Sequence, residues 1–303
     1  NTAALAFGGT PTTAATEEFN TGVIGGSWST GGDLNQGRNN LGGAGTQTAA
    51  LAIGGNVPPS SAKTEAYNGT NWTEVNDLNT ARQLFGAAGA TNTAALAFGG
   101  SPSTKTITET WNGTNWTEVN DLNTAIKSLA GAGTNTAALA FGGENPAAGG
   151  FTVDTELWNG SNWTEVNNLN TARSQLAGTG ATNTAALAFG GEASPGIAAV
   201  TESWNGTNWT EVNDLNTARK KLGGAGTQTS ALAFGGETPP NSALTESWNG
   251  TNWTETADLG TARQKLAAAG AANTSALAFG GDPGPTATEE WLDGAQVKTI
   301  STS

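Results

Sequence analysis

The 303-residue sequence contains no cysteine, no methionine and no histidine, and each absence excludes a kind of chemistry. Without cysteine there can be no disulfide, no thiolate nucleophile and no zinc–sulfur site. Without histidine the chain lacks the one side chain whose unperturbed pKa lies near neutrality. We therefore expect a protein that is not an enzyme and that holds no cofactor and no metal. The missing methionine also indicates a processed product or a segment of a longer chain.

Charged residues are also scarce, at 12% of the chain, and acidic residues outnumber basic ones by 25 to 12. A net charge of −13 argues against nucleic acid or an anionic membrane as a partner, because both reward a basic surface. No stretch approaches the roughly 20 apolar residues that a membrane span requires, so no membrane insertion is expected. Glycine, by contrast, is abundant at 44 residues, which suits many short strands joined by tight turns.

The sequence is dominated by a repeat. Its steps of 43 to 48 residues fit a four-stranded propeller blade and are too long for leucine-rich or ankyrin units. A solenoid of helix pairs is excluded, because no 3.6-residue apolar stripe runs for ten residues. The marker is Ala-Leu-Ala-Phe-Gly-Gly or a near copy, whose second glycine is Gly9, Gly55, Gly100, Gly143, Gly191, Gly236 and Gly281.

One repeat illustrates the four strands, named a to d, that we expect in each blade. Residues 221–226 are strand a, whose glycine and alanine allow close approach around a common axis. Residues 231–235 are strand b, with large and small side chains alternating. Residues 245–248 are strand c, the Asn-Gly pair in 249–252 forms a hairpin turn, and strand d starts at Trp253.

This pattern of an apolar run, Gly-Gly, and then one aromatic on strand c and another on strand d resembles the kelch repeat over nearly the whole chain. It departs from the usual kelch pattern in the tight Asn-Gly-Thr-Asn turn, which separates the two aromatics by only five positions. The pairs are Tyr67/Trp72, Trp111/Trp116, Trp158/Trp163, Trp204/Trp209 and Trp248/Trp253.

More narrowly, the wording Trp-Asn-Gly-Thr-Asn-Trp-Thr-Glu-Val-Asn-Asp-Leu-Asn-Thr-Ala-Arg is similar to repeat arrays in predicted structural proteins of marine bacteriophages. That resemblance implies a virion surface protein, such as a tail fibre or appendage. Its partners would be other virion proteins or a host-surface glycan.

The number of blades follows from counting strands. Copies of b, c and d can each be placed seven times, with Phe19 and Trp28 in the first repeat and 296–300 as the last strand d, but strand a occurs only six times. A six-bladed ring would leave three N-terminal strands as unpaired edges, which favour aggregation. We therefore predict an all-β, seven-bladed kelch-like β-propeller of four-stranded antiparallel blades, whose first blade lacks its innermost strand. It forms one domain over residues 1–303, with repeats starting near 1, 38, 82, 127, 173, 219 and 263.

The recurring aromatics have two interpretations. They could be stacking platforms for sugars, or they could pack between blades, where each buries about 150–250 Å². Recurrence at one strand position favours packing. The strand-d members, which we predict to be structural, are Trp72, Trp116, Trp163, Trp209 and Trp253.

A glutamate before each strand-c aromatic and an arginine before strand a also recur. Paired carboxylates could serve a glycosidase, but a ring of equivalent acids cannot supply an acid and a base in different environments. We expect structural Glu–Arg pairs, with Glu202 and Arg219 among their members and Ile126 as the exception. The residues are Glu65, Glu109, Glu156, Glu202, Glu246 and Glu289, with Arg38, Arg82, Arg173, Arg219 and Arg263.

An aspartate or asparagine on the d-to-a connection is a further candidate. Its oxygen could bind Ca²⁺, but a turn or capping role is commoner and no EF-hand-like loop is present. The residues are Asp77, Asp121, Asn168, Asp214 and Asp258.

The b-to-c loops are what varies between the repeats. By strand order they share one face with the d-to-a connections, and variable loops on a rigid scaffold are typical of recognition. Drift in unconstrained loops would give the same pattern. The candidate binding residues on these loops are Asn56, Pro58, Lys63, Lys105, Phe151, Asp154, Glu192, Glu237 and Asn241.

These observations together predict a non-catalytic structural and recognition module. We expect it outside the cell or on a virion surface, where it binds a host glycan or another virion protein. Assembly of several copies within an appendage is compatible with this hypothesis. The alternative is a secreted or cell-surface lectin-like adhesin of a bacterium or microalga.

Overall fold

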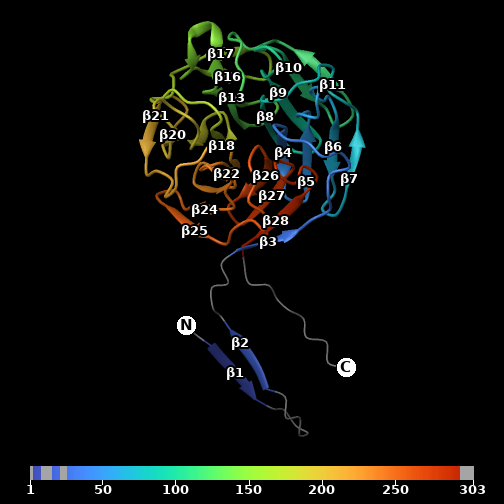
Figure 1. Cartoon of the computed structure of the whole chain (residues 1–303), viewed down its shortest axis with the longest axis vertical. Coiled ribbons are helices and arrows are strands. Elements are labelled where there is room, and N and C mark those ends of the chain that lie inside the picture. The colour runs from blue at the N-terminus through green and yellow to red at the C-terminus, as the bar shows by residue number, and fades with distance from the viewer. Residues whose placement is uncertain (1–2, 8–15, 21–25, 294–303) are drawn as a thin grey trace.

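The computed structural model of the chain describes residues 3–7, 16–20 and 26–293. Six four-stranded antiparallel sheets stand around a common axis as the blades of a β-propeller (Figure 1). Their innermost strands contact one another in succession, and the last of them contacts the first. The prediction of an all-β propeller with four-stranded antiparallel blades is therefore confirmed. No helix in these segments is long and apolar enough to cross a membrane.

The strands recur with nearly constant bounds. Blades one to three consist of β4 (Gly42–Thr46), β5 (Ala49–Ile53), β6 (Thr64–Tyr67) and β7 (Trp72–Val75); β8 (Gly86–Thr91), β9 (Ala94–Phe98), β10 (Thr108–Trp111) and β11 (Trp116–Val119); and β12 (Ala130–Gly133), β13 (Ala138–Phe141), β16 (Thr155–Trp158) and β17 (Trp163–Glu165). Blades four to six consist of β18 (Ala177–Thr182), β19 (Ala185–Phe189), β20 (Thr201–Trp204) and β21 (Trp209–Val212); β22 (Gly223–Thr227), β23 (Ser230–Phe234), β24 (Thr245–Trp248) and β25 (Trp253–Thr256); and β26 (Ala267–Ala272), β27 (Ser275–Phe279), β28 (Thr288–Leu292) and β3 (Ser27–Thr30).

The predicted number of seven blades is wrong. Strand β3, which we expected in a separate first blade, is the outermost strand of blade six, where Trp28 lies opposite Trp291. The strand d expected at 296–300 lies outside the described residues, and β3 takes its place. The ring is thus closed by one strand from near the N-terminus and three from near the C-terminus. Six copies of strand a make six blades.

Two further strands precede the ring. Strand β1 (Ala3–Phe7) pairs with β2 (Thr16–Asn20) as a two-stranded antiparallel sheet that belongs to no blade (Figure 1). One b-to-c loop also has structure of its own: in blade three, β14 (Glu144–Asn145) and β15 (Gly150–Phe151) flank the short 3₁₀ helix η1 (Pro146–Ala148).

Small residues bring the inner strands together. A Cβ placed on Gly43 of β4 would lie 2.2 Å from the backbone oxygen of Ala268 in the neighbouring inner strand β26. No larger side chain fits at that distance. Glycine and alanine in strand a therefore set the radius of the ring, as the composition of these strands predicts.

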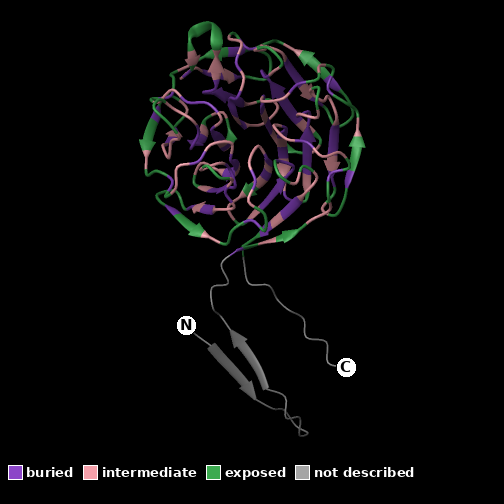
Figure 2. Cartoon of the chain, viewed as in Figure 1, coloured by how far each residue is buried: buried purple, intermediate pink, exposed green. Residues whose placement is uncertain are grey.

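Indoles hold neighbouring blades together. Each strand-d tryptophan donates its Nε1–H to the strand-c threonine of the preceding blade, as Trp116 does to Thr64 Oγ1 at 3.1 Å. Trp28 of β3 donates to Thr245 and Trp72 of blade one donates to Thr288, so the series continues through the closure. Most buried residues lie on the inner strands, where neighbouring blades pack against each other, while the outermost strands are largely exposed (Figure 2).

Candidate functional site

The strand-c glutamates are engaged in structural contacts. The buried carboxylate of Glu109 accepts a hydrogen bond from Arg82 Nη2 at 3.1 Å and others from the Asn79 and Thr80 backbone N–H groups. Each carboxylate thus joins its own blade to the segment that leads in from the preceding one. The same ion pair occurs in five blades, as Arg38–Glu65, Arg82–Glu109, Arg173–Glu202, Arg219–Glu246 and Arg263–Glu289.

Blade three has the carboxylate without the cation. Ile126 stands in the arginine position, and among the described residues Glu156 accepts hydrogen bonds from Asn123 and Thr124 only. Burial raises the pKa of Glu156 above its usual value, because the charged form loses hydration and no arginine compensates. This blade is the natural counterpart of the five paired ones.

The side chains of the aspartate and asparagine candidates accept hydrogen bonds from backbone N–H groups. Asp121 Oδ1 accepts from the Thr108 N–H at 3.1 Å, at the start of strand β10, and Asn168 does the same for Thr155 at 3.0 Å. Asp77, Asp214 and Asp258 repeat this contact in their blades. Within the part of the chain that the structure describes, no three acidic side chains gather in a way that could hold a metal ion.

The predicted structural tryptophans lie between blades. Trp72, Trp116, Trp163, Trp209 and Trp253 are each about 5% exposed. The ring of Trp163 lies 4.9 Å from Phe98 of the preceding blade, and the same contact recurs around the propeller. These rings are packed and present no stacking surface to a ligand.

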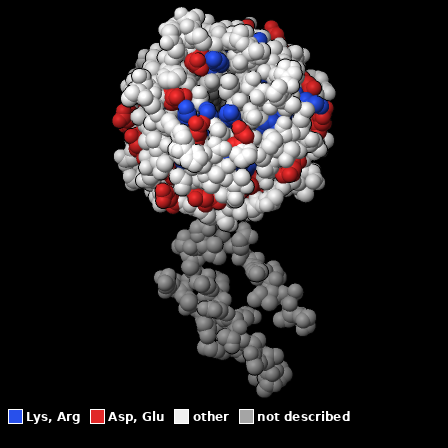
Figure 3. Space-filling view, in the orientation of Figure 1, with Lys and Arg blue, Asp and Glu red and all other residues white. Residues whose placement is uncertain are grey.

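The b-to-c loops and the d-to-a connections do share one face, which we call the loop face. Isolated bridges join a connection to a loop in each blade, for example Gln83 to Ser101 and Lys220 to Glu237. In Figure 3, lysine and acidic side chains gather around a central hollow on the propeller. The variable segments thus surround the axis of the ring.

The candidate binding residues fall into two groups on this face. Glu192 pairs with Lys220 at 3.0 Å and Glu237 with Lys221, while Asn241 donates to the backbone oxygen of Asp282 at 2.9 Å. These three lie on the loops of blades four and five. The others lie on the loops of blades one to three: Asn56, Pro58, Lys63, Lys105, Phe151 and Asp154.

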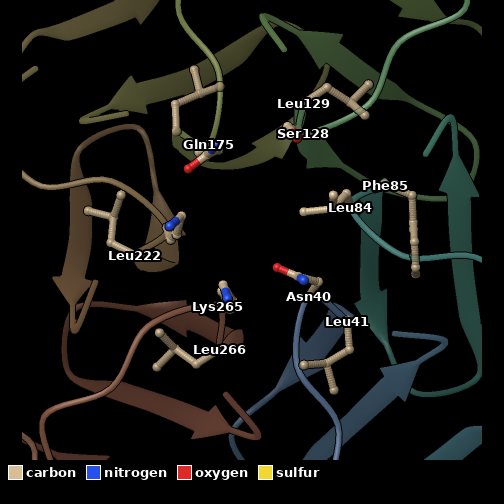
Figure 4. Close-up of a pocket in the computed structure, with 12 residues that line it drawn as sticks. Asn40, Leu41, Leu84, Phe85, Ser128, Leu129, Gln175, Leu222, Lys265 and Leu266 are labelled. Carbon is tan, nitrogen blue, oxygen red and sulfur yellow. The ribbon is translucent and has the colours of Figure 1, made fainter. Parts of the chain in front are cut away.

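Sequence reasoning missed the residues at the centre. A hollow of about 100 Å³ lies on the axis at the loop face (Figure 4). Its rim is formed by one residue from each d-to-a connection, and each donates its backbone N–H to the backbone oxygen of its counterpart in the preceding blade, at 2.7 to 3.1 Å. These six rim residues are Asn40, Leu84, Ser128, Gln175, Lys221 and Lys265.

All six rim residues adopt the left-handed backbone conformation, with φ between 51° and 57°. Residues with a side chain rarely do so, and for leucine and lysine the conformation costs about 1–2 kcal/mol. The closed ring of hydrogen bonds imposes it here. Glycine adopts this conformation without that cost, and none of the six rim residues is a glycine.

Five of the six rim residues are polar. The apolar one, Leu84, lies between Asn40 and Ser128 (Figure 4). Lys221 is held from outside by Glu237, whose pKa is lowered by the hydrogen bond from that lysine. Below the rim, a ring of five leucines and Phe85 forms the wall. A group with both polar and apolar edges fits this arrangement.

A signal for the rim exists in the sequence. The rim residue lies two positions after the recurring arginine and one before a leucine that only Phe85 replaces. Between these nearly constant neighbours, five residue types occur in six copies. The position before the rim residue varies too, as Asn39, Gln83, Lys127, Ser174, Lys220 and Gln264, so the signal is a variable pair of residues inside a nearly constant segment.

Comparison with models of known protein families finds no match to this chain, and no curated protein is significantly similar to it in sequence.

Proposed function

We propose that this protein is a non-catalytic recognition module whose ligand binds the loop face at the mouth of the axial hollow. One observation carries the proposal: six strained rim positions hold five residue types, each just before a leucine that only Phe85 replaces. Glycine adopts this conformation without the steric cost, and no rim position has it. The cost in backbone strain supports a role in binding.

The contacts of the acidic residues favour binding over catalysis. The strand-c glutamates hold the blades together, and the aspartates of the connections cap strands. A general acid and a general base need different environments, whereas these groups repeat one environment around the ring. The rim instead offers amide, hydroxyl and ammonium groups beside leucine, which are the groups that recognise the polar and apolar edges of a sugar or a protein loop.

The setting that we propose is a virion surface, in a tail fibre or appendage. Its support is the resemblance of the repeat wording to arrays in predicted structural proteins of marine bacteriophages, together with the kelch-like Gly-Gly and paired aromatics of each blade. The ligand in that setting is a host-surface glycan or another virion protein.

The proposal is tested with a glycan array and with pull-down from a lysate of the host. The variant Lys221→Ala/Lys265→Ala should weaken any binding by about tenfold or more, because a hydrogen bond to a charged group contributes about 1.5–3 kcal/mol. Thr251→Ala, on an exposed turn of the opposite face, is the matched control. Full binding by Lys221→Ala/Lys265→Ala, equal to that of the Thr251→Ala control, would refute a site at the rim.

A further inference from the structure

The hairpin β1–β2 is a second copy of the middle hairpin of blade six. Residues 1–20 align without a gap to residues 273–292, which include β27 and β28, and 13 of the 20 positions are identical. The strand register is also the same. Leu5 lies opposite Glu18 and Phe7 opposite Thr16 in the first copy, as Leu277 and Phe279 lie opposite Glu290 and Thr288 in the second.

One shared residue is specific to the closing blade. Glu290 accepts a hydrogen bond from the hydroxyl of Tyr67 in blade one at 2.5 Å, and Tyr67 is the only tyrosine of the chain. Burial and this bond raise the pKa of Tyr67 to about 12. Only the β1–β2 copy repeats the glutamate, as Glu18. The equivalent residues in blades one to five are Ala66, Thr110, Leu157, Ser203 and Ser247.

The connection to β3 points the same way. In the other blades a four-residue turn, such as 112–115, joins strand c to strand d. Six residues, 21–26, separate β2 from β3, and β3 is the strand d of blade six. Strand c of a blade pairs with strand d, and β2 is followed directly by β3, the strand d of blade six. The spacing between β2 and β3 allows these two strands to pair.

We propose that blade six has two interchangeable middle hairpins within one chain. In the observed state β27–β28 lies between β26 and β3. In the alternative state β1–β2 takes that place in the same register, and β27–β28 is released. The acceptor is the chain's own blade six, because the short connection to β3 gives β1–β2 a high local concentration there.

Side-chain contacts explain why the observed state is preferred. Trp291 donates its Nε1–H to the Asn273 backbone oxygen at 2.9 Å, and Ser275 donates to Gln47 Oε1 of blade one at 2.8 Å. The first copy has Phe19 and Ala3 in the places of Trp291 and Ser275, and neither side chain can donate a hydrogen bond. The two states therefore differ by a few hydrogen bonds rather than by a whole blade.

The exchange can be detected by disulfide trapping, since the chain has no cysteine of its own. Ala268 of β26 pairs with Ala278 of β27, whose counterpart in β1 is Ala6. The variant Ala6→Cys/Ala268→Cys should form an intramolecular disulfide slowly, as the alternative state is visited. Ala278→Cys/Ala268→Cys should form its disulfide rapidly, and Leu5→Cys/Ala268→Cys, out of register by one residue, should not crosslink.

A substitution that makes the two hairpins more alike should shift the balance. Adding Trp291→Phe should raise the yield of the 6–268 disulfide about fivefold, the factor expected for one lost hydrogen bond. Trp248→Phe removes the equivalent bond in blade five and should leave that yield unchanged. Circular dichroism verifies that both variants fold. The proposal is overturned by the absence of the 6–268 disulfide, by its formation only between two chains, or by an equal response to the two substitutions.

Discussion

At the scale of single residues, the Glu–Arg pairs show how a charge is kept inside a propeller. Burial lowers the pKa of Arg82 to about 10, while the carboxylate of Glu109 acts in the opposite direction. The guanidinium also donates to the backbone oxygens of Ile107 and Ala97, at 2.7 and 3.2 Å. A buried pair of this kind adds little over an apolar core, but each member depends strongly on the other.

The variant Arg82→Ala should therefore lower the free energy of unfolding by about 3–5 kcal/mol, because it leaves the Glu109 carboxylate buried without its cation. Urea denaturation at pH 7 measures the loss. Arg82→Ala/Glu109→Gln should recover part of it, and ligand affinity at the loop face should not change. An unchanged melting temperature for Arg82→Ala would contradict this account of the pair.

Blade three permits the reverse experiment. Ile126→Arg should stabilise the protein at pH 8, because a guanidinium beside the buried Glu156 carboxylate favours its charged form. Folding raises the pKa of Glu156 above about 4.3, which is the pKa of a glutamate in an unfolded chain. The wild type therefore loses stability as the pH rises from about 4.3 through the raised pKa. The new arginine cancels that loss, so the gain should shrink toward pH 4. Ile126→Leu is the control, and a gain independent of pH would contradict the prediction.

At the scale of elements, the local patterns were sufficient to predict the hairpins. Strand c of blade five was predicted at 245–248 and observed there, because alternation and the Asn-Gly turn are properties of neighbouring residues. Strand a was predicted from 221 and begins at Gly223. The two residues before it leave the sheet, since the backbone of Lys221 joins the ring around the axis. That contact lies between blades and is not visible in one repeat.

The strand that closes the ring depends on a glycine beside it. A Cβ on Gly26 would lie 2.1 Å from Cζ2 of Trp291, so Gly26→Ala should cost about 1–3 kcal/mol through overpacking. Chemical denaturation measures the cost. Gly196→Ala is the matched control, because no atom lies within 4 Å of the added methyl there. Equal stability of the two variants would show that the packing around Trp291 accommodates the added methyl group without strain.

At the scale of the whole molecule, the sequence predicted a closed ring but not the way in which it closes. The six copies of strand a were the correct count of blades. The argument for seven assumed that a six-bladed ring leaves three strands unpaired, but β3 joins blade six, and β1 pairs with β2. Pairing between Trp28 and Trp291 spans almost the full length of the chain, and no pattern within a repeat encodes it.

Truncation tests this closure. A chain lacking residues 1–25 keeps all 24 blade strands and should unfold at nearly the same urea concentration as the full chain. A chain lacking residues 1–30 loses β3 and exposes the edge of β28. Its stability should fall by at least about 3 kcal/mol, the usual cost of deleting a large aromatic from a packed site. Equal stability of the two truncated chains would mean that β3 is dispensable.

The cyclic hydrogen bonds of the rim also have an electrostatic consequence for the axial mouth. All six N–H groups point the same way around the circle, so their peptide dipoles run tangentially and cancel. The backbone therefore gives the mouth no electrostatic preference of its own, unlike a helix terminus. If a ligand binds there as we propose, its selectivity comes from the six side chains, because backbone groups alone make the circle.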